Sequence, residues 1–379
     1  MTASALTRPG ERDRLSSKFA ELDWRVIGLL CILAGIGTAM LYSIAGGHWQ
    51  PWAAKHLIRF GVLLVAMIGM AMVHPKWWFH AAYPLYGVLL VLVLMIEFTP
   101  LGYTAGGAKN WLNLGFTRIQ PAEFVKIGLV LALARWYHGH SAQEARWSWK
   151  LLIPVGMIGV PFLLVAKQPD LGSAMIIGLT GAAVMFMAGL SWRVIAAAVA
   201  AAVAVIPPFV MFVMHDYQRN RVLTFLNPEA DPSGTGYNII QSKIALGSGG
   251  LMGKGYGLGS QSQLEFLPER HTDFIFSTVS EEFGFLGSFT VLACYVALIL
   301  TSSHSHFGRI SAAGMTAFLA LFVLINGAMV MGLAPVVGVP MPLLSYGGST
   351  MMTVMIGFGL ILSMRVHRYV ELPKGQGLF

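Results

Sequence analysis

Residues 264–284 read Leu-Glu-Phe-Leu-Pro-Glu-Arg-His-Thr-Asp-Phe-Ile-Phe-Ser-Thr-Val-Ser-Glu-Glu-Phe-Gly, and they join a polar connection to an apolar helix. The first part of this stretch is dense in ionisable side chains, namely Glu265, Glu269, Arg270, His271 and Asp273. Two more carboxylates, Glu281 and Glu282, follow about two helical turns later. Because charge at the lip of a membrane helix is costly, such a cluster marks a functional site by default.

The composition of the whole chain places this helix in a bilayer. The 379 residues are 56% hydrophobic and 11% charged, with a mean hydropathy of +0.67, whereas soluble domains carry about 25% charged residues. The net charge of +8 is spread over many short loops, which indicates no nucleic-acid partner and suits anionic membrane lipids. Cys31 and Cys294 lie in apolar runs and predict neither a disulfide framework nor a metal site.

Apolar runs near the length that a membrane span needs recur along the chain. The sequence therefore predicts an all-α polytopic membrane protein with about ten transmembrane helices, at about 24–46, 55–73, 78–98, 120–137, 149–167, 171–190, 193–213, 273–302, 309–333 and 343–366. Ten spans place both termini on one side, and the excess of Lys and Arg on that side makes it the cytoplasm.

This topology predicts three parts of the chain in the cytoplasmic (inner) membrane. They are a cytoplasmic N-terminal tail, 1–23, a transmembrane domain, 24–368, and a cytoplasmic C-terminal tail, 369–379. No cleavable signal peptide is expected, since the first apolar run is long enough to span.

Two outer connections are long, at about 99–119 and 214–272, and loops of such length are usually functional or disordered. The second is the long extracytoplasmic loop between helices 7 and 8. Within it, residues 237–246 predict an amphipathic helix, whose apolar stripe of Ile239, Ile240, Ile244 and Leu246 would lie on the membrane surface.

Asp273 is the first candidate site residue. A general base needs a carboxylate within hydrogen-bond reach of the hydroxyl that it activates, and Asp273 is predicted at the water boundary of a helix. The alternative is that Asp273 or Thr272 caps this helix and complements its dipole. The neighbouring Arg270 and His271 favour a functional role, and we assign His271 to substrate binding.

Residues 120–126, Gln-Pro-Ala-Glu-Phe-Val-Lys, form a second candidate. Pro121 suits the first position of a helix, which sets Glu123 and Lys126 on one face at a spacing of three residues. A lysine in the membrane must be paired. The two residues are therefore either a structural ion pair or a pair that lines a substrate cavity.

Several basic residues are candidates for binding phosphate, because Arg binds it bidentately and Lys as a point charge. Lys167 lies in a tight outer turn with Asp170, although Asp170 can equally cap the next helix. Basic residues of the long loop are further candidates: Arg219, Arg221, Lys243 and Lys254. The glycine-dense stretch 247–259 fits either a phosphate cradle or simple flexibility.

Two further stretches complete the candidates. Residues 106–112 contain Lys109, which we assign to substrate binding, and Trp111, either an interfacial anchor or a ring that stacks on a sugar. Residues 335–349 contain three prolines and several glycines, which predict a broken outer loop that lines a cavity through Ser345 and Tyr346. In the span before it, Asn326 is expected to donate hydrogen bonds between helices.

These motifs together resemble the SEDS family (shape, elongation, division and sporulation), in particular its RodA branch. The matching residues are 120–126, 167–172, 215–219, 237–245, 264–276 and 345–349, and the resemblance extends from the first helix to about Arg368. The first 20 residues match nothing in this family, and Met252 stands where some relatives carry a basic residue.

The resemblance implies a peptidoglycan glycosyltransferase of cell elongation. Such an enzyme polymerises lipid II into β-1,4-linked glycan strands on the outer membrane face and releases undecaprenyl diphosphate. Asp273 matches the catalytic aspartate, and Glu123 with Lys126 matches the cavity pair. The implied partners are lipid II, the nascent glycan strand, membrane lipids and a class B penicillin-binding protein, which is a transpeptidase.

No cofactor is firmly implied. A divalent cation such as Mg or Mn would help to expel a diphosphate, but no ligand cluster in the sequence demands one. Two alternative functions stay open: a flippase (transporter) for the same lipid and a non-catalytic scaffold of the elongation complex. A transporter would place its polar residues near the membrane midplane, whereas a scaffold would not need Asp273.

Overall fold

The computed structural model describes residues 15–99, 102–105, 108–113, 118–140, 149–212, 216–230, 234–299 and 306–368. The predicted C-terminal tail and most of the predicted N-terminal tail lie outside these residues. A short helix, α1 (Leu15–Ala20), precedes the first long helix.

A long helix occupies each of the ten ranges predicted to span the membrane. The bounds are α2 (Trp24–Ile44), α3 (Ala53–Met72), α4 (Pro75–Phe98), α5 (Pro121–His138), α7 (Leu152–Lys167), α8 (Leu171–Met187), α9 (Trp192–Phe212), α13 (Ile275–Ile299), α14 (His306–Val330) and α15 (Gly348–Val366). Among the described residues, seven segments are long and apolar enough to cross a bilayer, namely α2, α3, α4, α13, α14, α15 and α7 with the short 3-10 turn η2 (Trp149–Leu151) before it. The exact number of crossings stays a prediction, because α8 is shorter and α5 carries Glu123, Lys126 and Arg135.

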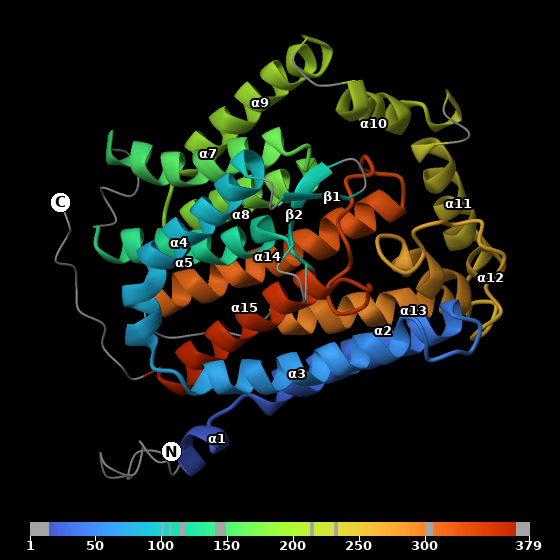
Figure 1. Ribbon diagram of the computed structural model, residues 1–379, viewed down its shortest axis with the longest axis horizontal. Coiled ribbons are helices and arrows are strands. Elements are labelled where there is room, and N and C mark those ends of the chain that lie inside the picture. Colours follow the sequence, from blue (N-terminus) through green and yellow to red (C-terminus); the bar gives the residue numbers. More distant parts are fainter. Residues whose placement is uncertain are drawn as a thin grey trace.

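Most of the long helices lie roughly along one direction, α4 and α9 are inclined to them, and the bundle forms around α5, α14 and α15 (Figure 1). The side chains of α5 and α15 are buried on nearly all sides. Arg365, near the end of α15, pairs with Asp23 at the start of α2. The two described ends of the chain therefore meet at one end of the bundle, as expected for an even number of crossings.

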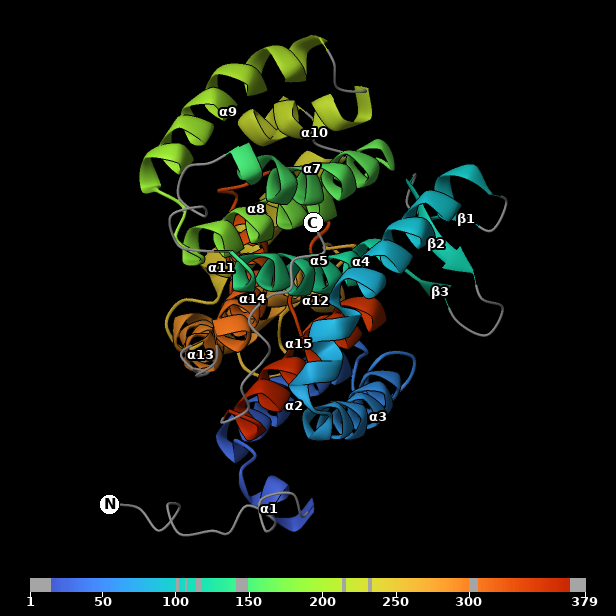
Figure 2. The ribbon, with the colours of Figure 1, turned by 90° about the vertical axis from the view of Figure 1, so that its left-hand side faces the viewer.

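The first outer connection contains a small sheet that the sequence does not predict. Strands β1 (Gly102–Ala105), β2 (Ala108–Asn113) and β3 (Arg118–Ile119) pair antiparallel in the order β1-β2-β3. Tyr103 pairs with Trp111 across two of them, and such cross-strand aromatic pairs stabilise short hairpins. The sheet projects from the side of the bundle beside α4 (Figure 2).

The second outer connection is largely helical. It contains α10 (Asp216–Leu226), the 3-10 turn η3 (Pro228–Ala230), α11 (Thr235–Ser248) and α12 (Ser260–Gln263). The predicted helix at 237–246 is present as α11, but its apolar stripe does not all face the membrane. Ile239 is buried in the core, whereas Ile244 is 46% exposed. The buried face of α11 also includes Ser242 and Ala245, because α11 packs against the core rather than lying flat on lipid.

The glycine-dense stretch 247–259 docks on a kink in α13 at Gly284, which has φ +65°. The amides of Lys254 and Gly255 donate to the carbonyls of Glu281 and Glu282, both at 3.0 Å. A kink frees backbone groups that must find new partners inside a membrane. The glycines thus allow close backbone packing against α13. The structure fits neither of the two roles predicted for this stretch, a phosphate cradle and a flexible loop.

The two buried carboxylates of α13 hold this stretch in place. Glu281 accepts from Lys254 Nζ at 2.7 Å, from Ser260 Oγ at 3.0 Å and from the amide of Gln261. Glu282 accepts from Ser43 Oγ of α2 at 2.5 Å. Lys254, a phosphate candidate in the sequence, is therefore paired with a carboxylate.

The tight docking predicts a large cost for Gly253→Ala. Gly253 has φ +81°, and an added Cβ would lie 2.1 Å from the carbonyl oxygen of Glu282. We expect a loss of about 1–3 kcal/mol from overpacking alone, measured as a lower Tm in detergent. The matched control is Gly247→Ala, where nothing lies within 4 Å. If both variants melt like the wild type, the described contact between this stretch and α13 is wrong.

An irregular segment, 331–347, joins α14 to α15, as the prolines and glycines predict. Its first residues are exposed, with Leu333 at 70%, but its second half is buried in protein: Val339, Met341 and Leu344 are each at most 2% exposed. On one side α2 approaches so closely that a Cβ on Gly37 would lie 2.6 Å from the carbonyl oxygen of Leu343. Non-helical backbone is tolerated at membrane depth under such cover.

Candidate functional site

The candidate site is built around Val336–Val339, four residues of the irregular segment that we call the hub segment. The guanidinium of Arg221, from α10, donates to the carbonyl of Val336 at 3.2 Å. Gly172, in the first turn of α8, packs beneath the carbonyl of Val337, and a Cβ there would lie 2.4 Å from that oxygen. The hub segment therefore joins the start of α8 to the middle of α10, which are far apart in the sequence.

The other half of the hub segment faces the stretch that opens α13. A Cβ on Gly338 would lie 3.6 Å from Oδ2 of Asp273, so this carboxylate lies against the hub segment. The carbonyl of Val339 accepts from Asn326 Nδ2 at 2.7 Å, and the same nitrogen donates to the carbonyl of Asp273, also at 2.7 Å. Asp273 and the hub segment are thus held together by one side chain of α14.

Asp273 itself is half-buried, just before the first residue of α13. Burial raises the pKa of its carboxyl from 3.8 to about 7. The negative charge of Glu269 adds to this rise in pKa, and the positive charge of Arg221 opposes it. A carboxyl that titrates near neutrality can accept a proton efficiently at the pH where it works.

The capping interpretation of Asp273 does not fit the structure. Among the described residues, no backbone amide or side chain donates a hydrogen bond to the Asp273 carboxylate. An N-cap would instead accept from the amide two or three residues ahead, as Asp170 does from Ser173 at 3.0 Å at the start of α8. The oxygens of Asp273 are therefore available to a substrate hydroxyl.

Aromatic rings flank the residues before Asp273. The ring of His271 stacks on Trp52, with centroids 4.7 Å apart, and Tyr346 lies 6.3 Å from His271. The guanidinium of Arg59 lies over the ring of Tyr346, 4.9 Å from its centroid. Burial lowers the pKa of His271, so the imidazole is neutral at pH 7 and fits a binding or stacking role.

Glu123 and Lys126 form a buried ion pair at 2.6 Å, with Lys126 1% exposed and Glu123 4% exposed. The Lys126 ammonium lies 4.5 Å from the ring centroid of Phe322 on α14. Asn326, which holds Asp273, is four residues further along this helix, a rise of roughly 6 Å. The pair therefore lies about one turn below the Asp273 stretch, inside the bundle.

Two candidates have their polar atoms occupied by the protein. Asp170 caps α8 and also accepts from Asn110 Nδ2 at 3.2 Å and Gln120 Nε2 at 2.6 Å. Ser345 is 3% exposed; its hydroxyl donates to the carbonyl of Thr272 at 2.5 Å and accepts from the amide of Met341. Asp170 thus fits the capping alternative, and the cavity-lining position predicted for Ser345 is corrected to a buried one within the protein.

Three basic candidates lie away from Asp273 on the outer elements. Lys167 is exposed and pairs with Glu97 at 3.2 Å, Lys109 of β2 donates to the carbonyl of Thr99 at 3.1 Å, and Lys243 is exposed on α11. Within the described part of the chain, no hydrogen bond or ion pair links these lysines to the Asp273 stretch. On α10, the Nε of Arg219 is buried without a partner among the described residues.

Comparison with known proteins decides the family. Residues 19–370 match the family FTSW_RODA_SPOVE, described as a cell cycle protein. The chain belongs to this family. It is 45% identical over 353 residues to the peptidoglycan glycosyltransferase MrdB of Escherichia coli K12, covering 92% of this chain and 94% of that one. It is also 35% identical over 315 residues to the probable peptidoglycan glycosyltransferase FtsW of Geobacter sulfurreducens, covering 81% and 82% of the two chains.

Solved structures of the FtsW/RodA/SpoVE family share the fold. The crystal structure of RodA from Thermus thermophilus matches with a TM-score of 0.68 and 27% identity, over 92% of this chain and 98% of that one. A chain from a study of how a peptidoglycan synthase complex coordinates polymerization and crosslinking matches with a TM-score of 0.77 and 29% identity, over 92% and 99%. The prediction of an all-α polytopic membrane protein of this family is confirmed.

The sequence alone did not indicate that Trp52 and Arg59 belong to the candidate site. Trp52 is the N-cap residue of α3 and Arg59 lies in its second turn, both more than 200 residues from Asp273. An aromatic and a basic residue near a helix end are typical of any membrane interface, so no local signal separates these two from ordinary anchors.

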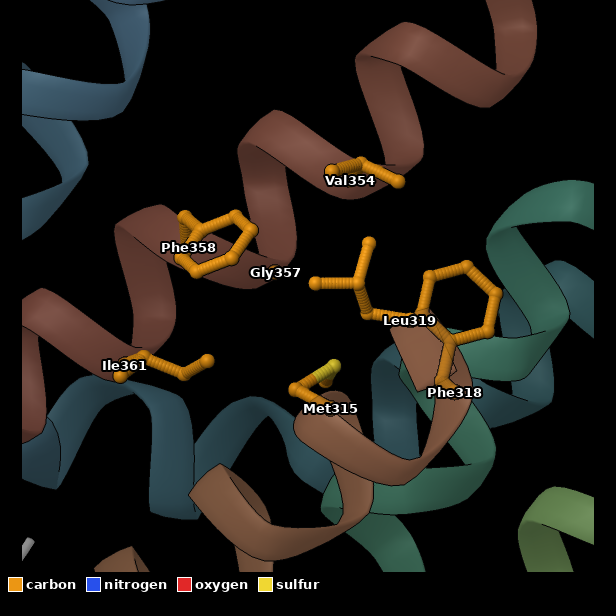
Figure 3. Close-up of a pocket in the computed structure, with 7 residues that line it drawn as sticks. All are labelled: Met315, Phe318, Leu319, Val354, Gly357, Phe358 and Ile361. Atoms are coloured by element: carbon orange, nitrogen blue, oxygen red, sulfur yellow. The ribbon is translucent and has the colours of Figure 1, made fainter. Parts of the chain in front are cut away.

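A small apolar pocket lies elsewhere, between α14 and α15 (Figure 3). Its lining side chains carry no titratable group; they are Met315, Phe318, Leu319, Val354, Gly357, Phe358 and Ile361. The pocket therefore offers no catalytic group. The described residues contain no group of three or more His, Cys, Asp or Glu side chains that could hold a metal ion. The hub segment and Asp273 therefore remain the candidate site.

Proposed function

We propose that this protein is a peptidoglycan glycosyltransferase that polymerises lipid II into β-1,4-linked glycan strands during cell elongation. The observation that supports it most is the Asp273 carboxyl. It is half-buried at the start of a membrane helix, accepts no hydrogen bond among the described residues, and has its pKa raised to about 7. The 45% identity to a peptidoglycan glycosyltransferase supports the same reaction.

In this proposal Asp273 is the general base. It takes the proton of the GlcNAc 4-hydroxyl on the acceptor, and that oxygen attacks C1 of the donor MurNAc as the bond to the diphosphate breaks. The attack inverts the anomeric centre and releases undecaprenyl diphosphate. Negative charge develops on the leaving group, and preorganised cations stabilise it.

Arg221 is the leading candidate for that stabilisation, because it lies at the hub segment and acts electrostatically on Asp273. Arg219, two residues before Arg221, carries a second guanidinium on α10 and is proposed as a further cation for the diphosphate. Lys109, Lys167 and Lys243 lie on outer elements and are proposed to contact more distant parts of the substrate. A divalent cation remains compatible with this chemistry.

The Glu123–Lys126 pair is proposed to support the substrate from inside the bundle. Its position about one turn of α14 below Asn326 favours this role, since Phe322 contacts Lys126 and Asn326 contacts Asp273. His271 is proposed to contact the sugar beside Asp273.

The proposed setting is the inner membrane, with both termini in the cytoplasm and the Asp273 stretch at the outer face. The ion pair between Arg365 and Asp23 supports termini on the same side. A class B penicillin-binding protein is the proposed partner, because a structural relative comes from a complex that couples polymerization to crosslinking. Lipid II, the growing strand and membrane lipids complete the partners.

The deciding experiment is polymerisation of purified lipid II by the detergent-solubilised protein with its cognate partner. We expect long glycan strands that depend on the protein. If no strand forms while the partner is active, the flippase alternative is tested by lipid II translocation across vesicle membranes. If neither activity is present, the scaffold alternative is favoured.

The pH dependence of polymerisation offers an independent prediction. A base works only when deprotonated, so the rate should rise about tenfold per pH unit below the Asp273 pKa and level off above about 7. Because Glu269 raises this pKa, Glu269→Gln should move the midpoint of the profile to lower pH. A profile with its midpoint near 4, the ordinary pKa of an aspartate, would show that burial does not raise the pKa of the carboxyl that limits the rate.

A further inference from the structure

Three consecutive backbone carbonyls of the catalytic stretch are each held by the irregular segment or by α14. The amide of Tyr346 donates to the carbonyl of His271 at 2.8 Å, and the Ser345 hydroxyl donates to that of Thr272 at 2.5 Å. Asn326 Nδ2 donates to the carbonyl of Asp273 at 2.7 Å. The backbone leading into the proposed base is therefore fixed at every residue.

Asn326 is an unusual residue for its position. It lies within α14, is fully buried, and its Oδ1 has no partner among the described residues. An unpaired polar atom in a buried setting costs about 1–3 kcal/mol, so an apolar side chain would suit the helix better. The two hydrogen bonds from Nδ2 are what the protein gains in exchange.

The two acceptors of Asn326 belong to the two segments that meet at the candidate site. One is the carbonyl of Asp273; the other is that of Val339, in the hub segment. Gly338, the neighbour of Val339, faces the Asp273 carboxylate. Asn326 therefore sets the spacing between the backbone of the base and the wall against which its carboxylate lies.

We propose that Asn326 and Ser345 are positioning residues for Asp273, and that they hold its carboxylate against the hub segment in the geometry the reaction needs. The inference rests on the proposed function, in which Asp273 is the base. It replaces the substrate contact predicted for Ser345 with a contact to the backbone of the catalytic stretch.

Loss of this clamp has two measurable consequences. A misplacement of about 1 Å at a reacting group can cost about 100-fold in rate. A looser Asp273 would also gain water, and because burial is the main cause of its raised pKa, the pKa would fall. The charged groups that act on the carboxyl are Glu269 of the same stretch and Arg221 of α10, and neither is changed by substitutions in α14.

The test compares Asn326→Leu and Ser345→Ala with the wild type in the lipid II polymerisation assay with the cognate partner. For Asn326→Leu we expect kcat to fall about 10- to 100-fold, KM to stay within about twofold, and the midpoint of the pH profile to move to lower pH. Ser345→Ala should shift kcat and the midpoint in the same directions, by less. A purely structural role would lower the amount of folded protein without moving the pH midpoint of what remains.

Ser311→Ala is the matched control, because Ser311 is also buried in α14 and its hydroxyl has no partner among the described residues. Its kcat and pH profile should equal those of the wild type. If Asp273→Asn is inactive while both clamp variants keep the wild-type kcat and midpoint, the positioning role is overturned and the proposed function stands. If Asp273→Asn stays active, the proposed base fails first. If Asn326→Leu does not fold, Ser345→Ala decides.

Discussion

Asp273→Asn is expected to reduce glycan polymerisation about 10²- to 10⁴-fold, the usual contribution of a general base. The amide has the shape of the carboxyl but cannot take the proton of the acceptor hydroxyl. Because Asp273 accepts no hydrogen bond among the described residues, the substitution removes no internal partner. Strand length and turnover from purified lipid II measure the loss.

The same variant should remain folded. The pKa of Asp273 is higher in the folded protein, about 7, than its ordinary value of 3.8. The folded state therefore holds the proton more tightly, and burying this group costs stability as the pH rises from about 4 through 7. Asp273→Asn avoids that cost, so at pH 8 its Tm should be at least that of the wild type, and it should still bind its partner.

Glu229→Gln is the control for Asp273→Asn. Glu229 is an exposed carboxylate of the same outer connection, in η3, so its neutralisation should leave polymerisation unchanged. Full activity of Asp273→Asn would remove Asp273 as the base and return the scaffold alternative. Equal losses in both variants would point to the net charge of the outer face instead.

Lys126→Met is expected to cost about 3–5 kcal/mol of stability, the usual effect of leaving a buried charge without its partner. Glu123 is 4% exposed, and its Oε2 already lacks a partner among the described residues. Its remaining contact, from Ser173 Oγ at 3.5 Å, cannot replace an ammonium. The loss is measured as a lower Tm and a lower yield of folded protein in detergent.

The double variant Glu123→Leu with Lys126→Met separates stability from function. Replacing a whole buried ion pair by apolar side chains is often neutral or stabilising, so the Tm should return to near that of the wild type. We expect polymerisation to stay lost, because apolar side chains cannot support a charged substrate. A double variant that is both stable and active would make the pair purely structural.

The sequence predicted the helices well because their signal is local. A run of about 20 apolar residues must cross the bilayer as a helix, and a helix indeed occupies each of the ten ranges. Proline and glycine likewise marked the irregular segment at 335–349. The sheet β1–β3 and the fold of 247–259 onto α13 escaped prediction, because both depend on contacts between distant backbone groups.

For the candidate site, the sequence by itself determined which residues carry ionisable groups and that Asp273 opens a membrane helix. It left capping and catalysis open for Asp273, and capping and substrate binding open for Asp170. Only the tertiary structure separates the two: Asp170 accepts from Ser173, Asn110 and Gln120, whereas Asp273 lies against Gly338 with its pKa raised to about 7. The reason is that burial and hydrogen-bond partners come from segments brought together by folding, which no local pattern encodes.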